Sequence, residues 1–551
     1  MAHIDTYDYV IIGSGFGGSV SAMRLIEKGY NVLVLERGKR FHDDDFPRTN
    51  WNIWRYLWAP LMRCFGILQL SLFNGFFVFH SSGVGGGSLV YAGVLMEPDE
   101  SFFSADSWNH LGDWRSILAP HYATARHMLG VTRNPNLWPA DEALRSIARE
   151  IGYGETFQPT EVGVFFNENS QEVLDPYFDG QGPPRAGCNH CGGCMVGCRY
   201  NAKNTLVKNY LYFAEKWGAD VHDQVMVQDI QPLEGEQSDG ARYEVVYQSS
   251  TSWLWKPELR VRARNVIVSA GVLGTNDLLL KCKNEHKSLP NISNHLGKTV
   301  RTNSEAFLGS FNPTEIVDHS KGLAITSIFQ ADETTRIEPV RFSDGSSLIF
   351  WLIAAPFNRP SGSFPKRFAS LLLDIFKQPG MFYRVKFKPG LTRRGTALMI
   401  MQTQNNLMRL HRGKSLLNMF KRGLIAEHDL DHTVPVNTDL GRSVTEKFAR
   451  EIKGEPVGTM LESLFDVPAT AHMLGGCLIG RDSSEGVVDL DCQVFNYPGL
   501  YVIDGSIVPA NPGINPSLTI TALAEYAMSR VPLKPGGASR EPLGPPFTDH
   551  D

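Results

Sequence analysis

The order of elements at the N-terminus limits the fold more strongly than any other part of the sequence. Residues 7–12 (YDYVII) are typical of a buried parallel strand. The cluster GSGFGG at residues 13–18 leads into an apolar-periodic helix that ends near Gly29, and residues 31–36 (NVLVLE) have the composition of a second strand. A strand, a glycine turn, a helix and a second strand in this order predict a Rossmann-type βαβ unit.

The spacing of the glycines in this turn fits the binding of a dinucleotide. Gly13 permits the tight turn, Gly15 lets the backbone approach a pyrophosphate, and Gly18 allows the helix to pack closely on the strand. Glu36 ends the second strand and is positioned to accept a hydrogen bond from a ribose hydroxyl. The alternative is a glycine-rich turn without a ligand, and the neighbouring Arg37 leaves NADP open as the dinucleotide.

A second glycine cluster lies at residues 83–88 (GVGGGS), next to the apolar stretch SLVYAGVLM. So many glycines beside an apolar stretch indicate backbone that is pressed against a flat or charged group. A flexible loop is the alternative, and it fits poorly because the apolar flanks are expected to be buried. The candidate binding positions of this cluster are Gly83, Gly85, Gly86, Gly87 and Ser88.

Near the C-terminus, a strand at residues 501–504 (YVID) is followed by the segment GINPSLTITA, which predicts a helix start. Asn515 is a favoured N-cap residue and Pro516 is favoured at the first helical position. The N-terminal end of such a helix carries partial positive charge, which stabilises a negative charge close to it.

His472, in the segment AHMLGGC, is the candidate acid–base residue. A histidine can take or hold a proton near neutral pH. The alternative is a buried histidine that satisfies its hydrogen bonds within the core. Cys477, in the same segment, is expected to be structural.

With these motifs the chain resembles the glucose–methanol–choline (GMC) flavoprotein oxidoreductases, and in particular their bacterial cholesterol oxidase-like branch, from Tyr7 to about Val531. The resemblance implies that the first glycine turn and Glu36 hold the ADP part of FAD and that the second glycine cluster lies along the flavin. It also implies that His472 and Asn515 face the flavin and contact the substrate oxygen. Further FAD contacts implied by the resemblance are Ala270, Gly271, Asp504 and Gly505.

The same resemblance implies an α/β fold in which a Rossmann-type FAD-binding domain is combined with a discontinuous α+β substrate domain. We expect the FAD-binding domain to comprise residues 1–105, 200–300 and 465–551, the substrate domain residues 300–464, a helical and loop insertion residues 106–199, and a disordered tail residues 535–551. The tail is rich in proline and glycine, which favours disorder.

The implied activity is FAD-dependent oxidation of the hydroxyl group of a sterol or another bulky hydrophobic alcohol, with O2 or another electron acceptor. Two alternatives remain open at this stage: an electron-transfer flavoprotein with FAD and an iron–sulfur cluster, and a non-catalytic lipid-binding protein. Sterol oxidases carry Asn-Gly-Gly where this chain has Tyr91-Ala92-Gly93, so redox tuning is expected to differ. They also use a substrate-domain glutamate, for which Glu305 is a candidate by residue type alone.

Four cysteines gather in the segment GCNHCGGCMVGC, at positions Cys188, Cys191, Cys194 and Cys198. Their C-x2-C-x2-C-x3-C spacing is close to the run that binds iron–sulfur clusters in bacterial ferredoxins, in which one run supplies only three ligands to its own cluster. The chain has no second run of this kind. An iron–sulfur cluster, free or disulfide-bonded thiols, and zinc therefore remain as alternatives.

Composition and charge limit the kinds of binding partner that the protein is expected to have. The net charge of −5 is unlike that of a nucleic-acid-binding protein, and the start lacks the pattern of a secretory signal, so a cytoplasmic location is expected. Residues 51–80 are strongly apolar, and residues 366–422 contain 13 Lys or Arg against one acid, Asp374. Residues 364–377 have the make-up of a basic amphipathic helix, followed by the strand-like MFYRVKFK. These stretches predict peripheral docking on a membrane surface, or else a half-buried helix with a solvated face.

Overall fold

A computed structural model describes residues 5–73, 76–314, 317–358, 362–404, 406–415, 420–428, 438–465 and 467–544. Its first layer is a parallel sheet in the order β12-β2-β1-β15, with β27 beside β15. The strands are β1 (Thr6–Ile12), β2 (Val32–Leu35), β12 (Asp220–His222), β15 (Leu259–Val268) and β27 (Leu500–Val502). Val266 and Ile12 lie at its centre without solvent contact or nearly so, because both faces of a parallel sheet are covered.

One edge of this sheet continues into an antiparallel meander. The first half of β15 pairs with β14 (Tyr243–Ser249), which pairs with β13 (Val225–Pro232). The second half of β15 pairs instead with β27. This late segment of the chain therefore joins the sheet beside β15, the strand that also pairs with β1. The predicted βαβ unit is therefore present, with β1 between β2 and β15.

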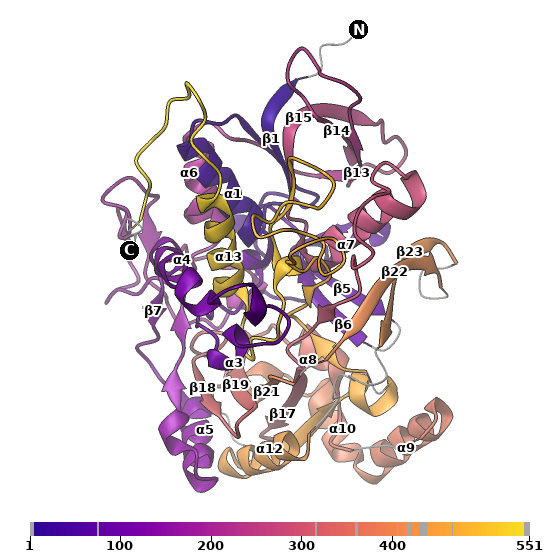
Figure 1. Ribbon diagram of the computed structural model, residues 1–551. Helices are drawn as coiled ribbons and strands as arrows, with labels where there is room; N and C mark the ends of the chain where they lie inside the picture. The colour runs from indigo at the N-terminus through magenta and orange to yellow at the C-terminus, as the bar shows by residue number, and fades with distance from the viewer. Residues whose placement is uncertain are drawn as a thin grey trace.

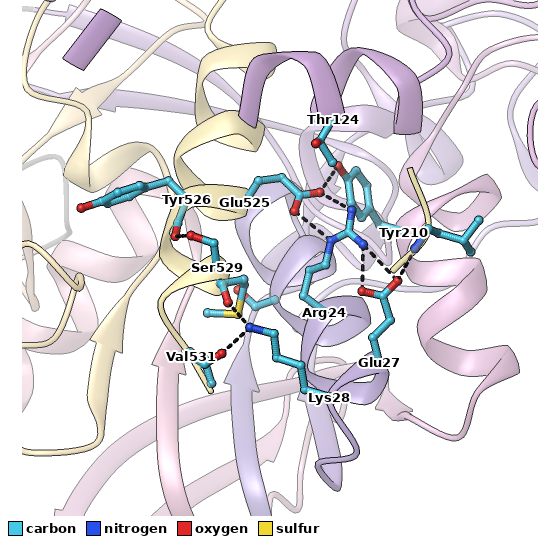
Figure 2. A network of polar contacts seen from close by, with 12 residues as sticks. Arg24, Glu27, Lys28, Thr124, Tyr210, Glu525, Tyr526, Ser529 and Val531 are labelled. Atoms are coloured by element: carbon cyan, nitrogen blue, oxygen red, sulfur yellow. Dashed lines mark hydrogen bonds and ion pairs between the residues drawn. The ribbon is translucent and has the colours of Figure 1, made fainter. Parts of the chain in front are cut away.

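Helices α1 (Phe16–Glu27), α6 (Tyr210–Lys216), α13 (Ser517–Ser529) and α4 (Trp114–Met128) pack on one another over one face of the sheet (Figure 1). Every residue of α1 is buried. Figure 2 shows the polar network inside this layer: Arg24 lies between Glu525 and Glu27, and Tyr210 donates to Glu525 at 2.6 Å. Because each buried charge has an opposite partner, the network is compatible with complete burial.

A second sheet, antiparallel throughout, forms the other half of the molecule in the order β20-β24-β17-β21-β19-β18-β8. Its strands are β20 (Ala354–Pro356), β24 (Glu455–Thr459), β17 (Ala306–Phe311), β21 (Gly395–Gln402), β19 (Thr335–Val340), β18 (Ser327–Gln330) and β8 (Gln158–Pro159). Helices α5 (Pro139–Glu150) and α12 (Asp439–Glu451) cover one face through a shared apolar cluster. The predicted insertion is thus divided, because α4 packs on the first layer whereas α5 and β8 belong to the second sheet.

Smaller elements connect the two halves. A four-stranded sheet contains β23 (Arg422–His428), β22 (Met408–Lys414), β16 (Val300–Arg301) and β26 (Leu474–Gly475). The apolar stretch 51–80 forms the hairpin of β5 (Leu68–Phe73) and β6 (Phe76–Ser81), and β6 pairs with β25 (Ala469–Thr470). The remaining short elements are α2 (Ile53–Tyr56), α3 (Glu100–Phe103), α7 (Gly271–Lys281), β3 (Trp58–Ala59), β4 (Cys64–Phe65), β7 (Thr132–Arg133), β9 (Glu161–Val162), β10 (Glu172–Val173) and β11 (Arg185–Ala186).

The basic segment begins with helices, up to Arg394, and continues with strands β21, β22 and β23. Helices α8 (Leu348–Ile353), α9 (Phe364–Lys377), α10 (Pro379–Phe387) and α11 (Leu391–Arg394) lie at the edge of the second sheet (Figure 1). The amphipathic helix is confirmed, whereas MFYRVKFK forms α10 instead of a strand, because its Met381 and Val385 fall on one helical face and pack inward. Within the described ranges, no helix is both long and apolar enough to cross a bilayer.

The C-terminal segment differs from the expected disorder as far as the structure describes it. The backbone N–H of Lys534 donates to the carbonyl of Lys28 at 3.0 Å, and that of Arg540 donates to the carbonyl of Glu27 at 2.7 Å. The N–H of Leu543 donates to the Glu27 carboxylate at 2.9 Å. These bonds compensate for the proline-rich composition by fixing the segment on the end of α1. Residues 545–551 of the predicted tail lie outside the described residues.

Candidate active site

The first glycine turn combines close packing with one open position. Gly13 has a φ of +101°, and a Cβ there would lie 2.2 Å from the carbonyl oxygen of Ser269. A Cβ on Gly18 would lie 2.0 Å from the carbonyl oxygen of Gly13, so both positions need glycine for the packing of strand, turn and helix. At Gly15, by contrast, a Cβ would meet no heavy atom within 4 Å. The free space above Gly15 fits a pyrophosphate that approaches the backbone.

Glu36 joins the two glycine segments. Its carboxylate accepts hydrogen bonds from the backbone N–H of Ser14 at 3.0 Å, from the Ser14 hydroxyl at 2.8 Å and from the N–H of Gly38 at 2.8 Å. The N–H of Gly83, in the second cluster, lies 3.4 Å from the same carboxylate. Glu36 therefore stands at the carboxyl end of β2, between the two loops, as the motif predicts, and it also orders the loops themselves.

The second glycine cluster is a packed turn. Gly85 has a φ of +102°, and a Cβ on Gly86 would lie 2.5 Å from the Cα of Gly15. The Ser88 hydroxyl donates to the carbonyl of Gly85 at 2.6 Å and accepts from the N–H of Leu206 at 3.0 Å. The backbones of the two glycine loops therefore touch directly, which only residues without a Cβ allow at this distance.

Two further segments meet at the carboxyl ends of β15 and β27. The Asp504 carboxylate accepts from the N–H of Gly271 at 2.9 Å and from the Thr275 hydroxyl at 2.5 Å. Burial raises the pKa of Asp504, against the lowering effect of these hydrogen bonds. Gly271, which follows Ala270, has a φ of +72° and no heavy atom within 4 Å of a Cβ position. This turn, like Gly15, leaves space on the side that faces the cavity.

All four segments open on one cavity of about 390 Å³. Gly15, Gly87, Gly271 and Gly505 line one part of it, and His472 and Asn515 line it as well. The rest of its wall is apolar and comes mainly from the second sheet and from α8, α10 and α11. The large apolar residues of this part are Phe79, Phe307, Phe311, Phe342, Ile349, Phe350, Ile353, Val385 and Leu391.

His472 lies directly after β25 and is half-buried. Its Nδ1 atom forms an ion pair with Oε1 of Glu305, and the other oxygen of Glu305 accepts from the backbone N–H of Ala471 at 2.8 Å. The amide nitrogen of Asn303 lies 3.2 Å from the same Nδ1 and 2.9 Å from the carbonyl oxygen of Ile514, to which it donates. Glu305, which the sequence suggested by residue type alone, is thus brought to the Nδ1 side of His472.

Asn515 is buried and its side-chain oxygen has no hydrogen-bond partner among the described residues. The helix that follows begins at Ser517 with Pro516 as its N-cap, one residue later than predicted, and no side chain caps it. Asn515 is therefore not the N-cap. Its side-chain oxygen is therefore left available to the cavity that Asn515 lines, while its side chain also contacts Glu338, and α13 begins two residues later.

Glu338, on β19, was not identified from the sequence. Burial raises the pKa of Glu338 to about 8, although Arg336 and Asn515 act to lower it. Neither of its carboxylate oxygens has a geometrically good hydrogen bond within the described structure. Glu338 is not among the residues that line the cavity, and it interacts with Asn515 and Glu305. The strand reads TRIEPV, with Thr335 and Arg336 beside Glu338, so no local pattern in the sequence marks this glutamate as buried.

The cysteine segment, for which a metal centre was one alternative, shows no metal-binding arrangement among the described residues. All eight cysteines are free thiols. Among the residues that the structure describes, no three His, Cys, Asp or Glu side chains are arranged to hold a metal ion. Burial raises the pKa of Cys191 to about 12, and it also raises the pKa of Cys188 and Cys194.

The cysteine side chains are not grouped for a metal because they take part in apolar packing. Cys194 begins a short 3-10 turn, and Cys188, Cys194 and Cys198 pack in an apolar cluster with residues such as Val164 and Leu323. The ammonium group of Lys203 enters this segment and donates to the carbonyls of Cys194 at 2.6 Å and Leu89 at 2.9 Å. The iron–sulfur and zinc hypotheses therefore gain no support, and the segment braces the second glycine loop, to which Leu89 belongs.

Comparisons with known proteins agree with this geometry. Sequence models of the GMC oxidoreductase family match residues 184–300 and 432–524. A cholesterol oxidase from Acinetobacter baumannii is 43% identical over 96% of this chain and 95% of its own length. A cholesterol oxidase from Mycobacterium tuberculosis is 41% identical over 98% of this chain and 94% of its own length.

Among solved structures, pyridoxine 4-oxidase matches with a TM-score of 0.60 and 16% identity, over 95% of this chain and 99% of the other, which supports the fold. The two bacterial relatives are 41–43% identical over almost the whole chain, which is enough to show a shared family. The chain therefore belongs to the GMC oxidoreductase family and is an FAD-dependent alcohol oxidoreductase with the α/β architecture of that family.

Proposed function

We propose that the protein oxidises the hydroxyl group of a sterol or another bulky hydrophobic alcohol to the ketone or aldehyde, with FAD as the hydride acceptor and O2 as the final electron acceptor. One observation carries this proposal: the glycine loops, His472, Asn515 and a large apolar chamber line one continuous cavity. The names of the two bacterial relatives support a sterol as substrate.

The residues at the cavity fit FAD. The open space at Gly15 and Gly271 suits a ligand that touches the backbone, and the N-terminus of α1 suits its phosphates. Glu36, the 83–88 loop and Asp504 order the surrounding turns. When bound, FAD supplies the site that accepts the hydride.

His472 and Asn515 supply the polar groups at the reacting end. His472 accepts the hydroxyl proton of the substrate, and the amide of Asn515 donates a hydrogen bond to the substrate oxygen. The N-terminus of α13 places partial positive charge behind Asn515. The apolar chamber holds the hydrocarbon body of the alcohol and excludes water from the reacting atoms.

The test is a screen of sterols and long-chain alcohols by anaerobic flavin reduction, followed by measurement of hydrogen peroxide after air is admitted. We expect bleaching of the flavin absorbance with bulky hydrophobic alcohols and peroxide in equal amount to the carbonyl product. A flavin that no alcohol bleaches would instead favour an electron-transfer flavoprotein or a lipid-binding role. Bleaching without peroxide would assign the protein as a dehydrogenase with another acceptor.

We further propose that a membrane surface delivers the substrate. Ile353 of α8, Val385 of α10 and Leu391 of α11 line the cavity from inside, while the outer faces of α8, α9 and α10 expose apolar side chains. The most exposed of these on α9 and α10 are Phe364, Phe368, Leu373, Phe376, Tyr383 and Phe387, at 46–80% of their surface. Lys366 and Lys377, at the two ends of α9, are exposed beside them. Aromatic residues next to lysines suit the interface of an anionic bilayer.

A further inference from the structure

We propose that Glu305 is a positioning residue that fixes the tautomer of His472, so that Nε2 is the atom that accepts the substrate proton. This inference deepens the proposed alcohol oxidation and rests on it. Glu305 directly precedes β17 and has no solvent exposure. Its carboxylate joins the second sheet to the segment after β25, which carries His472.

The two oxygens of Glu305 have separate roles. Oε2 accepts from the backbone N–H of Ala471 at 2.8 Å, which sets the direction of the carboxylate. Oε1 then faces Nδ1 of His472 at ion-pair distance and has no hydrogen-bond partner of good geometry among the described residues. An ionised carboxylate only accepts hydrogen bonds, so the nitrogen that faces it carries the proton. With the proton on Nδ1, the lone pair of a neutral His472 is on Nε2.

Asn303 makes the choice of tautomer depend on Glu305. Its amide nitrogen is bound to the carbonyl oxygen of Ile514 and lies 3.2 Å from the same Nδ1 of His472. An amide nitrogen is a donor, so it favours an Nδ1 that accepts and therefore a proton on Nε2. The carboxylate of Glu305 opposes this preference. Without that carboxylate, Asn303 would favour the tautomer that cannot take a proton at Nε2.

The contact between Glu305 and His472 also stabilises the positive charge that His472 gains when it takes up the substrate proton. In the oxidation step, the O–H bond of the alcohol breaks and its proton passes to Nε2 of His472. The C–H bond breaks with its electron pair, which leaves as hydride to oxidised FAD, and the carbon–oxygen double bond forms. His472 is then an imidazolium, and the buried carboxylate of Glu305 stabilises it. Asn303 connects this pair to Ile514, the residue before Asn515, so both polar groups of the site are held together.

The direct test is the tautomer of His472 in the FAD-loaded protein without substrate. Protein with 15N-labelled histidine is studied by NMR, and the signal is assigned by its loss in His472→Asn. We expect the Nδ1-protonated form in the wild-type protein and a shift toward the Nε2-protonated form in Glu305→Gln. A wild-type His472 that carries its proton on Nε2, or a tautomer unaffected by Glu305→Gln, overturns the proposal. This readout needs no substrate, so it remains decisive if the proposed alcohol chemistry fails.

The kinetic test is stopped-flow flavin reduction by the best alcohol of the screen. We expect Glu305→Gln to lower the limiting rate by about 10²-fold or more, since misplacing a histidine tautomer in a comparable pair costs about 10⁴-fold. The substrate dissociation constant is expected to change less than about threefold, because Glu305 contacts His472 and not the alcohol. Glu305→Asp, which keeps a carboxylate, recovers part of the rate. A wild-type limiting rate in Glu305→Gln, or no recovery in Glu305→Asp when both variants retain FAD and thermal stability, contradicts the proposal.

Discussion

Arg24 and Glu525 are 501 positions apart in the chain and form a two-point ion pair, with Nε 2.8 Å from Oε2 and Nη2 2.9 Å from Oε1. Both side chains are almost completely buried. The pair joins α1, whose N-terminus starts at the first glycine turn, to α13, whose N-terminus follows Asn515 (Figure 2). The pair therefore ties together, within the packed helical layer, the two helices that begin at separate parts of the proposed active site.

The first prediction concerns this pair. Glu525→Leu leaves Arg24 buried with Glu27 as its remaining carboxylate, and we expect a loss of about 3–5 kcal/mol in the free energy of unfolding, the usual cost of breaking a buried ion pair. Denaturant or thermal unfolding of the purified protein measures it. The double variant Arg24→Met/Glu525→Leu is expected to be less stable than the single variant, because it leaves the buried Glu27 carboxylate without its arginine. A double variant as stable as the single variant would contradict a charge contribution from the remaining Arg24–Glu27 pair.

The second prediction separates the roles of the glycines in the first turn. Gly15→Val is expected to fold, because a side chain there meets no protein atom, and to lose FAD, because the side chain fills the space of the pyrophosphate. Gly13→Val is the matched comparison and is expected to lose the fold, because its Cβ would lie 2.2 Å from the Ser269 carbonyl oxygen. Flavin absorbance per protein and circular dichroism report the two outcomes. A fully yellow Gly15→Val protein would refute this placement of FAD.

The third prediction addresses the two polar groups at the substrate end. His472→Ala and Asn515→Ala are each expected to slow flavin reduction by about 10²-fold or more, because acid–base groups contribute about 10²–10⁴-fold. FAD content is expected to stay at the wild-type level, since the glycine loops are unchanged. Single-turnover stopped-flow absorbance provides the measurement. Rates equal to the wild type would exclude the altered residue from the mechanism.

The fourth prediction is a pH dependence that originates from Glu338. Burial raises its pKa to about 8, whereas a glutamate in an unfolded chain titrates near ~4.3. Between these values the folded protein holds a proton that the unfolded chain has lost, so this group makes the folded state less stable as pH rises through that window. Glu338→Gln is expected to remove this decline. Melting temperatures of both proteins between about pH 5 and pH 8 test it, and parallel curves would contradict the buried, proton-holding state of Glu338.

The fifth prediction concerns the exposed face of α9. The protein is expected to sediment with phosphatidylglycerol-containing vesicles at low salt and to dissociate as the salt concentration rises, because charge attraction is screened. Phe368→Ser/Phe376→Ser is expected to weaken binding. Trp255→Ser is a suitable control, since Trp255 is 79% exposed in the loop between β14 and β15. Absence of sedimentation with vesicles at low salt would leave α9 as a solvated helix, and equal losses in both variants would place the contact elsewhere.

Local patterns in the sequence were sufficient for the nucleotide-binding half of the fold. The glycine spacing in residues 13–18 depends on a strand, a turn and a helix that are adjacent in the chain, so its meaning can be read without the tertiary structure. His472 and Asn515 were identified through a resemblance, and the structure places both in one cavity.

The contacts that the sequence did not reveal join distant segments. Asn303, which was not identified, and Glu305, which was a candidate by residue type alone, meet His472 because the segment before β17 lies beside the segment after β25. His472 is 169 positions from Asn303. Glu338 is identified by its burial and not by any local pattern. The cysteine spacing left iron–sulfur, zinc and free thiols open because ligand spacing does not fix side-chain direction, and in the structure Cys188, Cys194 and Cys198 pack in an apolar cluster.

The position of β27 and α13 in the chain has a consequence for biosynthesis. The nucleotide turn is translated first, but β27, Asp504, Asn515 and the helix that holds Arg24 are among the last segments to leave the ribosome. A nascent chain therefore exposes Arg24, which is buried in the folded protein, until Glu525 has been made 501 positions later. FAD can be enclosed only after β27 and α13 have left the ribosome, so a ribosome that stalls before β27 yields a polypeptide unable to complete the site.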